Sequence, residues 1–174
     1  MQEARGNIPV GKGARVNLHD ELRKLMEKLH SCGLDVALCG GVALSFHGYT
    51  RFTKDIDLLV QSEDVERVKA VVVELGFVHP AAPMWFNTGT EKEQEVHRIS
   101  KIQGKEILTL DLLVVGLLLK QVWEEREVYQ WRGLEVPVVS AEGLVNMKRL
   151  AGRGQDRVDI EKLGFDPDSE GGHA

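Results

Sequence analysis

Apolar residues recur every three or four positions in the segment that follows residue 17. This stripe consists of Leu18, Leu22, Leu25, Met26 and Leu29. The spacing places these side chains on one face of an α-helix. Asn17 can cap the first turn, and Gly33 is suited to end the helix. The pattern therefore predicts an amphipathic helix over residues 18–29.

A short apolar run at residues 36–38 precedes two consecutive glycines, Gly40 and Gly41, and residues 42–46 then suit a short helix. The order is strand, glycine turn and helix. Because glycine has no side chain, the backbone of such a turn can approach phosphate oxygens closely, next to a helix N-terminus. Ser45 lies one turn into the predicted helix and could add a hydroxyl.

Two later segments alternate acidic and apolar residues. In Asp55–Val60, Asp55 and Asp57 alternate with Ile56, Leu58 and Val60. The period of two predicts a strand whose two aspartates share one face. Residues 107–115 form a second such strand. Its two faces carry Thr109, Asp111 and Leu113 on one side, and Leu108, Leu110 and Leu112 on the other.

The remaining elements follow from the same rules. A helix is predicted between Ser62, as its cap, and Gly76, as its stop. The other expected elements are a strand over residues 96–102, a helix over 117–123, a hairpin through Val128 and Val136, and helices over 141–150 and 155–163. Interleaved helices and strands indicate an α/β (α+β) fold with a mixed β-sheet flanked by helices.

The chain of 174 residues has the size of one domain. Residues 1–16 mix glycine, proline and charge without apolar periodicity, and residues 166–174 are acidic and rich in glycine. Both segments are expected to be flexible tails. The folded domain is therefore predicted to span residues 17–165.

Composition narrows the choice of partners and compartment. The net charge of -5 gives no overall attraction to nucleic acid, although a local basic patch could supply one. Cys32 and Cys39 have no neighbours that would complete a zinc site. The longest apolar run is too short for a membrane span. A cytoplasmic protein is the expectation.

Three aspartates on predicted strands carry the candidate chemistry. Asp55, Asp57 and Asp111 would each be costly among apolar residues unless a partner compensates their charge. A shared metal ion is one solution, and a site made only of carboxylate oxygens suits Mg²⁺ or Mn²⁺. Two such ions can activate a hydroxyl and neutralise a triphosphate, which is the chemistry of nucleotidyl transfer.

At this point the sequence resembles a known superfamily. The residues that carry the resemblance are Leu38, Cys39, Gly40, Gly41, Ala43, Gly48, Arg51, Thr53 and the run Asp55, Ile56, Asp57, Leu58. Together they look like the signature of the nucleotidyltransferases of the DNA polymerase β superfamily, with Asp111 in the place of the third acid. The similar proteins are minimal members, namely toxin–antitoxin-associated and short aminoglycoside nucleotidyltransferases.

The resemblance implies a function and a site. The expected activity is metal-dependent transfer of an NMP from an NTP, which is the co-substrate, to a hydroxyl of tRNA, a protein or a small molecule, within a toxin–antitoxin system or outside one. Asp55, Asp57 and Asp111 would be catalytic and would bind Mg²⁺ or Mn²⁺. The expected nucleotide-binding residues are Gly40, Gly41, Ser45, Arg51, Lys54 and Lys148. The resemblance does not decide whether the chain binds a protein partner or forms a homodimer.

Several residues also have simpler interpretations. Asp111 could pair with a lysine or arginine, and Gly41 replaces the serine of the commoner Gly-Ser form. Asp156 and Asp159 are expected on a polar helix face, paired with Arg153 or Arg157. His97 and Arg98 are expected on an exposed strand face, and Trp85 and Phe86 in a loop pinned to the core. The alternative function is a non-catalytic nucleotide-binding or protein-interaction module with the same fold.

Overall fold

The computed structural model describes residues 2–3, 17–50 and 52–169. Its strands are β1 (Gln2–Glu3), β2 (Val36–Cys39), β3 (Asp55–Val60), β4 (His79–Pro80), β5 (Met84–Phe86), β6 (Gln94–Gln103), β7 (Glu106–Val114), β8 (Glu127–Trp131) and β9 (Leu134–Val138). Its helices are α1 (Leu18–Ser31), α2 (Gly40–Phe46), α3 (Val65–Val73), α4 (Lys120–Glu124), α5 (Ala141–Ala151) and α6 (Gly154–Lys162).

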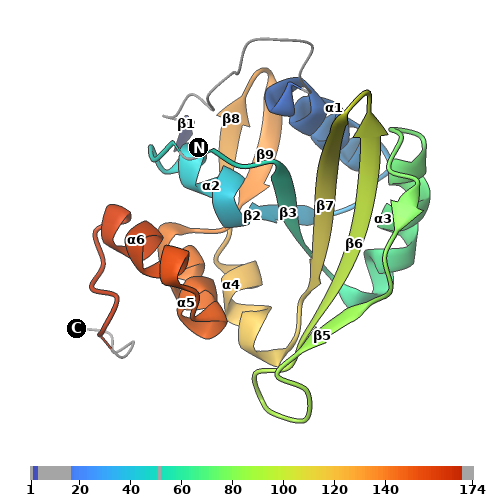
Figure 1. Cartoon of the computed structure of the whole chain (residues 1–174). Coiled ribbons are helices and arrows are strands. Elements are labelled where there is room, and N and C mark those ends of the chain that lie inside the picture. Colours follow the sequence, from blue (N-terminus) through green and yellow to red (C-terminus); the bar gives the residue numbers. More distant parts are fainter. Residues whose placement is uncertain (1, 4–16, 51, 170–174) are drawn as a thin grey trace.

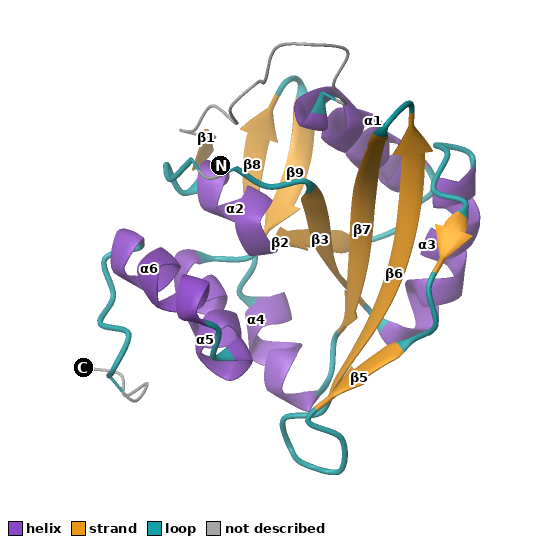
Figure 2. Cartoon of the chain, in the orientation of Figure 1, coloured by secondary structure: helices purple, strands orange, loops and turns teal. Residues whose placement is uncertain are grey.

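The strands form one mixed sheet in the order β1-β8-β9-β2-β3-β7-β6-β4, and β5 pairs with β6 (Figure 1). The neighbours β3 and β7 are parallel, whereas β6 and β7 form an antiparallel hairpin. Figure 2 shows helices flanking this sheet, with α5 and α6 on the opposite side of the view from α3. The predicted mixed α+β architecture is confirmed.

Local sequence signals explain most elements. The Asn17 side chain accepts hydrogen bonds from the backbone of His19 and Asp20, so α1 begins where the cap predicts. The helix after Ser62 differs from the prediction. The Ser62 hydroxyl donates to the Glu63 carboxylate instead of capping, and a 3₁₀ turn over Ser62–Asp64 precedes α3. The short strands β4 and β5 were not predicted, because two or three residues show no periodicity.

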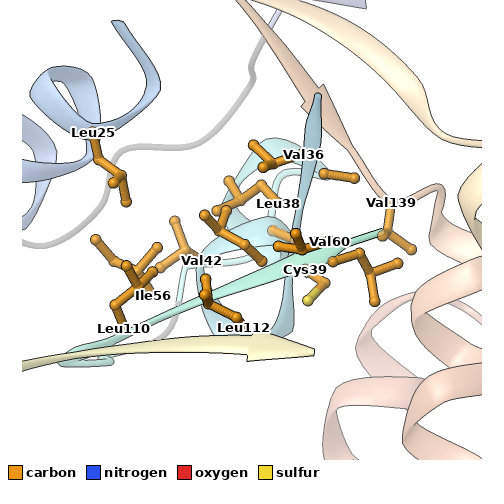
Figure 3. Packing of buried hydrophobic residues seen from close by; sticks show 14 of the residues in the cluster. Leu25, Val36, Leu38, Cys39, Val42, Ile56, Val60, Leu110, Leu112 and Val139 are labelled. Atoms are coloured by element: carbon orange, nitrogen blue, oxygen red, sulfur yellow. The ribbon is translucent and has the colours of Figure 1, made fainter. Parts of the chain in front are cut away.

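The apolar faces of β3 and β7 build the core. Ile56, Leu58, Leu110 and Leu112 are fully buried. They belong to one cluster with Leu25 of α1 and with Val68 and Val72 of α3. Figure 3 shows Ile56, Leu110 and Leu112 together with Val42 of α2. This packing fixes the register of the two strands, since a slip of one residue would place the opposite face in the core.

Most of the two predicted tails lies outside the described residues, namely residues 1, 4–16 and 170–174. Within the first tail, Gln2 and Glu3 pair with β8 as a parallel strand. Within the second, residues 166–169 contact α5 and α6. Among the residues that the structure describes, no helix is both long and apolar enough to cross a membrane.

Candidate active site

The polar faces of β3 and β7 bring two of the predicted acids together. In the parallel pairing Asp57 lies opposite Asp111, and Asp55 lies opposite Thr109. Paired residues of neighbouring strands share a face of the sheet, so all three aspartates project from the face opposite the leucine core. Asp111 is 7% exposed, Asp57 is partly buried and Asp55 is exposed. The register therefore produces a row of carboxylates at the sheet surface.

The glycine turn lies directly against these acids. Gly40 begins α2 with a φ of 63°, a conformation that favours glycine. A Cβ at this position would lie 2.0 Å from Oδ2 of Asp57, so the absence of a side chain makes room for the carboxylate. The backbone N–H of Gly41 donates a hydrogen bond to Asp57. The two glycines thus position an acid, in addition to any contact with a phosphate.

The convergence of negative charge changes the acidity of the site. Burial, together with the charges of Asp111 and Asp55, raises the pKa of Asp57 from 3.8 to about 7, while the charge of Arg153 opposes this rise. Burial and the same carboxylates, Asp57 and Asp111, also raise the pKa of the Cys39 thiol. Such an excess of negative charge favours protonation or a bound cation.

Arg98 on β6 is a member of the site that the sequence prediction placed on an exposed strand face. Its Nε donates to Oδ1 of Asp111 at 2.8 Å and its Nη2 to Oδ2 at 2.7 Å. These hydrogen bonds raise the pKa of Arg98. The pairing with a basic residue, considered above for Asp111, is therefore present. Arg98 is exposed, as predicted, whereas the neighbouring His97 is buried and bonded to Glu95.

A turn signal could have identified Arg98. Gln103 pairs with Glu106, which leaves Gly104 and Lys105 as a two-residue hairpin turn. Counting outward from that turn places Arg98 opposite Asp111. The prediction already contained both strands, but it did not pair them.

The donor set has the chemistry of a divalent-cation site, because carboxylate oxygens are the ligands that Mg²⁺ and Mn²⁺ prefer. Within the described part of the chain, however, no group of three or more His, Cys, Asp or Glu side chains could hold a metal ion as it stands. Both oxygens of Asp111 are bound by Arg98. Asp55 and Asp57 fit a cation, and Asp111 would have to exchange Arg98 for it.

Asp57 and Asp111 line a cleft with a volume of about 570 Å³. Charged residues of the lining include Asp57, Asp111, Arg98 and Arg153. The apolar lining comprises Met84, Phe86, Val96, Leu113, Leu118, Leu119, Met147 and Leu150. Phe86 therefore lines the cleft, and both it and Trp85 are 51% exposed, so they do not pin a loop to the core. The volume is that of a typical small-molecule site.

The other predicted nucleotide-binding residues lie in varied surroundings. Ser45 is 2% exposed, and its hydroxyl has no hydrogen-bond partner among the described residues. Lys54 is exposed next to Asp55. Arg51 lies outside the described residues. Ser45 is thus in the interior, Lys54 is free to reach solvent, and their proposed contacts with a nucleotide remain predictions.

Lys148 of α5 is buried between two aspartates. Its Nζ lies 2.8 Å from Asp159 and 3.5 Å from Asp156. Asp156 also binds Arg153, as expected, and Asp159 pairs with Lys148. Both aspartates are buried, so the expected polar helix face is wrong for them. Lys148 joins α5 to α6 here, and its contact with a phosphate stays a prediction.

Comparisons with known proteins give the family and the fold of the chain. Residues 12–147 match the family described as uncharacterised nucleotidyltransferase. No curated protein matches the chain significantly. A provisionally assigned nucleotidyltransferase from Thermotoga maritima has a similar structure, with a TM-score of 0.58, 18% identity, and coverage of 85% of this chain and 92% of that one.

A second similar structure is the solution structure of the antibiotic-resistance factor ANT(2'')-Ia. It has a TM-score of 0.52 and 14% identity, and the match covers 83% of this chain and 80% of that one. At these identities the two structures establish the fold alone. Since the family match spans most of the chain, this protein belongs to the family of uncharacterised nucleotidyltransferases.

Proposed function

We propose that this protein transfers an NMP from an NTP to an acceptor hydroxyl with the help of a divalent cation. The observation that carries the proposal is the register of β3 and β7, which pairs Asp57 with Asp111 in the lining of the cleft. Gly40, on the other side of Asp57, leaves room for its carboxylate. Membership of the family supports the reaction class, and the paired acids support their assignment to its site.

The residues divide the reaction between them. The acceptor oxygen attacks the α-phosphorus, the bond from that phosphorus to the β-phosphate oxygen breaks, and pyrophosphate leaves. Asp111 accepts the proton of the acceptor hydroxyl. The backbone of Gly40 and Gly41 binds the phosphates, and Lys54 and Arg51 contribute positive charge to them. Arg98 moves from Asp111 toward the triphosphate as the acid enters the reaction.

Mg²⁺ or Mn²⁺ would be held by Asp55 and Asp57, with Asp111 as the third ligand. When bound, such a cation neutralises charge on the triphosphate and activates the attacking hydroxyl. The raised pKa of Asp57 supports this assignment, since it reflects burial and the negative charges of Asp111 and Asp55, and a cation would offset that charge. The rest of the chemistry comes from side chains and backbone of this chain.

The direct test is transfer of label from α-labelled NTPs, with MgCl₂ or MnCl₂, to total tRNA, to protein extracts and to hydroxylated small molecules. We expect label on one acceptor class, together with release of pyrophosphate. Asp57→Asn and Asp55→Asn should each abolish it while the far-UV circular dichroism stays unchanged. Full turnover in either variant would contradict the proposal. Growth arrest on expression would support a role in a toxin–antitoxin system.

One observation favours a second function, a nucleotide-binding module without catalysis. The bidentate bond between Arg98 and Asp111 closes the third acid to a metal ion. Such a module would bind an NTP but release no pyrophosphate with any acceptor. The variant Arg98→Gln frees Asp111, so it shows whether the bond to Arg98 is what prevents transfer. Transfer activity in the wild-type protein would exclude the module.

A further inference from the structure

Three arginines lie around a second cavity, which has a volume of about 530 Å³ and is located on α5 and α6. Arg149, Arg153 and Arg157 follow one another at intervals of four residues. Gly152, in the left-handed conformation, ends α5 between the first two of them. Arg153 lines both this cavity and the cleft of the acids. The arginines therefore lead from the candidate active site across the helical surface.

Acidic and polar groups of the C-terminal segment 166–169 now occupy this surface. Arg157 makes a two-pronged bond to the Asp168 carboxylate, with distances of 2.8 and 2.9 Å. Nη2 of Arg149 donates to the Asp166 carbonyl and to Oγ of Ser169, both at 2.8 Å. A guanidinium that holds a carboxylate in this manner has the geometry that also suits a phosphate.

The arginines retain further binding capacity. Nε of Arg149 is buried without a hydrogen-bond partner in the part of the chain that the structure describes. The Arg153 side chain is 78% exposed, and its bond to Asp156 uses only Nε, at 3.2 Å. The ion pair between Arg157 and Asp168 is exposed to solvent, so it holds the C-terminal segment only weakly. A stronger anion can displace the segment.

We propose that Arg149, Arg153 and Arg157 bind successive phosphates of a single-stranded nucleic acid whose terminal hydroxyl is the acceptor in the cleft, and that Asp168 occupies the strand's place in its absence. This inference rests on the proposed function. The proposed function requires the phosphates of an NTP next to Asp55 and Asp57, whereas the second cavity is a separate one that shares Arg153 with the cleft. A strand with a hydroxyl end supplies both the acceptor and the additional phosphates.

The test is the binding of a fluorescein-labelled oligoribonucleotide, followed by anisotropy in a series of salt concentrations. Arg149→Gln together with Arg157→Gln should weaken binding about tenfold or more at low salt and lower the salt slope by about one to two, as expected for two lost phosphate contacts. Arg67→Gln is the matched control, because Arg67 is exposed on α3 and paired with Asp64. It should bind as the wild type does.

Asp168→Asn supplies a test that does not depend on removing an arginine. The substitution weakens the bond by which residue 168 occupies Arg157. Affinity for the oligonucleotide should therefore rise severalfold, while thermal stability changes little. Wild-type affinity in both the double-arginine variant and Asp168→Asn would overturn the inference, as would equal competition by poly-glutamate. Calorimetric binding of NTP, measured in the same variants, should be unchanged. Failure of the strand site thus remains distinguishable from failure of the nucleotide site.

Discussion

The two faces of β3 and β7 have opposite character although they are made by alternate residues of the same strands. One face, with Ile56 and Leu110, is fully buried against the other apolar residues of the core. The other carries Asp57 and Asp111, whose negative charges converge. The side chains of the apolar face need no further partner, since each is packed against other residues of the core. On the acidic face Arg98 binds Asp111, and Gly41 of the glycine turn donates a hydrogen bond to Asp57.

This difference indicates where stability and function are located. Packing on the leucine face fixes the strand register, and the register places the acids side by side. The acids themselves carry an electrostatic cost that packing has to offset. Changes on the first face should therefore alter stability, and changes on the second should alter binding and acidity.

The largest expected effect comes from a pair of neighbours on β7. Leu110→Ala removes a fully buried side chain and should lower the free energy of unfolding by about 2 to 5 kcal/mol. Thr109→Ala, on the acidic face and only partly buried, should cost less than about 1 kcal/mol. Urea denaturation measures both. Equal losses in the two variants would remove the contrast between the faces.

Gly40→Ala tests how tightly the turn encloses Asp57. Its Cβ would overlap the carboxylate, whereas the control Gly33→Ala has a similar φ of 67° and no atom within 4 Å of the added Cβ. Both variants carry the cost of a left-handed conformation, about 1 kcal/mol. Gly40→Ala should cost about 1 to 2 kcal/mol more and should lose nucleotide binding. Equal melting temperatures would show that Asp57 has room to move.

The pH dependence of stability tests the convergence of charge. In metal-free buffer the folded protein holds a proton on Asp57 up to about pH 7, while the unfolded chain releases it near its ordinary value of 3.8. The native state therefore binds more protons in this interval, and wild-type stability falls as the pH rises through it.

Asp57→Asn cannot titrate, so its advantage in unfolding free energy should grow from about pH 4 to pH 7 and then level off. Because Asp57 retains some contact with solvent, we expect about 1 to 2 kcal/mol. Chemical denaturation at several pH values measures the difference. A constant difference across this range would mean that burial and the neighbouring carboxylates do not raise the pKa of Asp57.

The smallest predicted effect concerns Arg98. Arg98→Gln frees the Asp111 carboxylate, so the affinity of the nucleotide-free protein for Mg²⁺ should rise about fivefold, equivalent to about 1 kcal/mol. Magnesium titration followed by calorimetry measures it. Arg23→Gln, which removes an exposed arginine paired with Glu27 on α1, should leave the affinity unchanged. A loss of affinity in Arg98→Gln would show that the arginine supports the metal ligands.

The helices and the long strands could be predicted because their signals are local. The alternation in Asp55–Val60 gave the strand and the shared face of its two aspartates, and Asn17 gave the start of α1. The predicted family and fold are confirmed by the matches described above. Asp111 was predicted on a strand from the pattern of residues 107–115, and the register places it opposite Asp57.

The partners of the acids could not be read in the same way, since they depend on contacts between distant segments. Arg98 meets Asp111 only through the hairpin register of β6 and β7. Lys148 becomes buried only because α6 folds back on α5 and brings Asp159 to it. A lysine on an amphipathic helix gives no local sign of such a pair. Strand order and helix packing, not periodicity, determine these contacts.

The most direct test of the central claim is calorimetric titration of the purified protein with each NTP in MgCl₂, compared with Asp57→Asn and Asp55→Asn. It requires no assumption about the acceptor. The account predicts binding of at least one NTP that depends on Mg²⁺ and is lost in both variants, although their circular dichroism is unchanged. Binding that persists in the variants, or that is independent of Mg²⁺, would contradict the assignment of Asp55, Asp57 and Asp111 as the metal site.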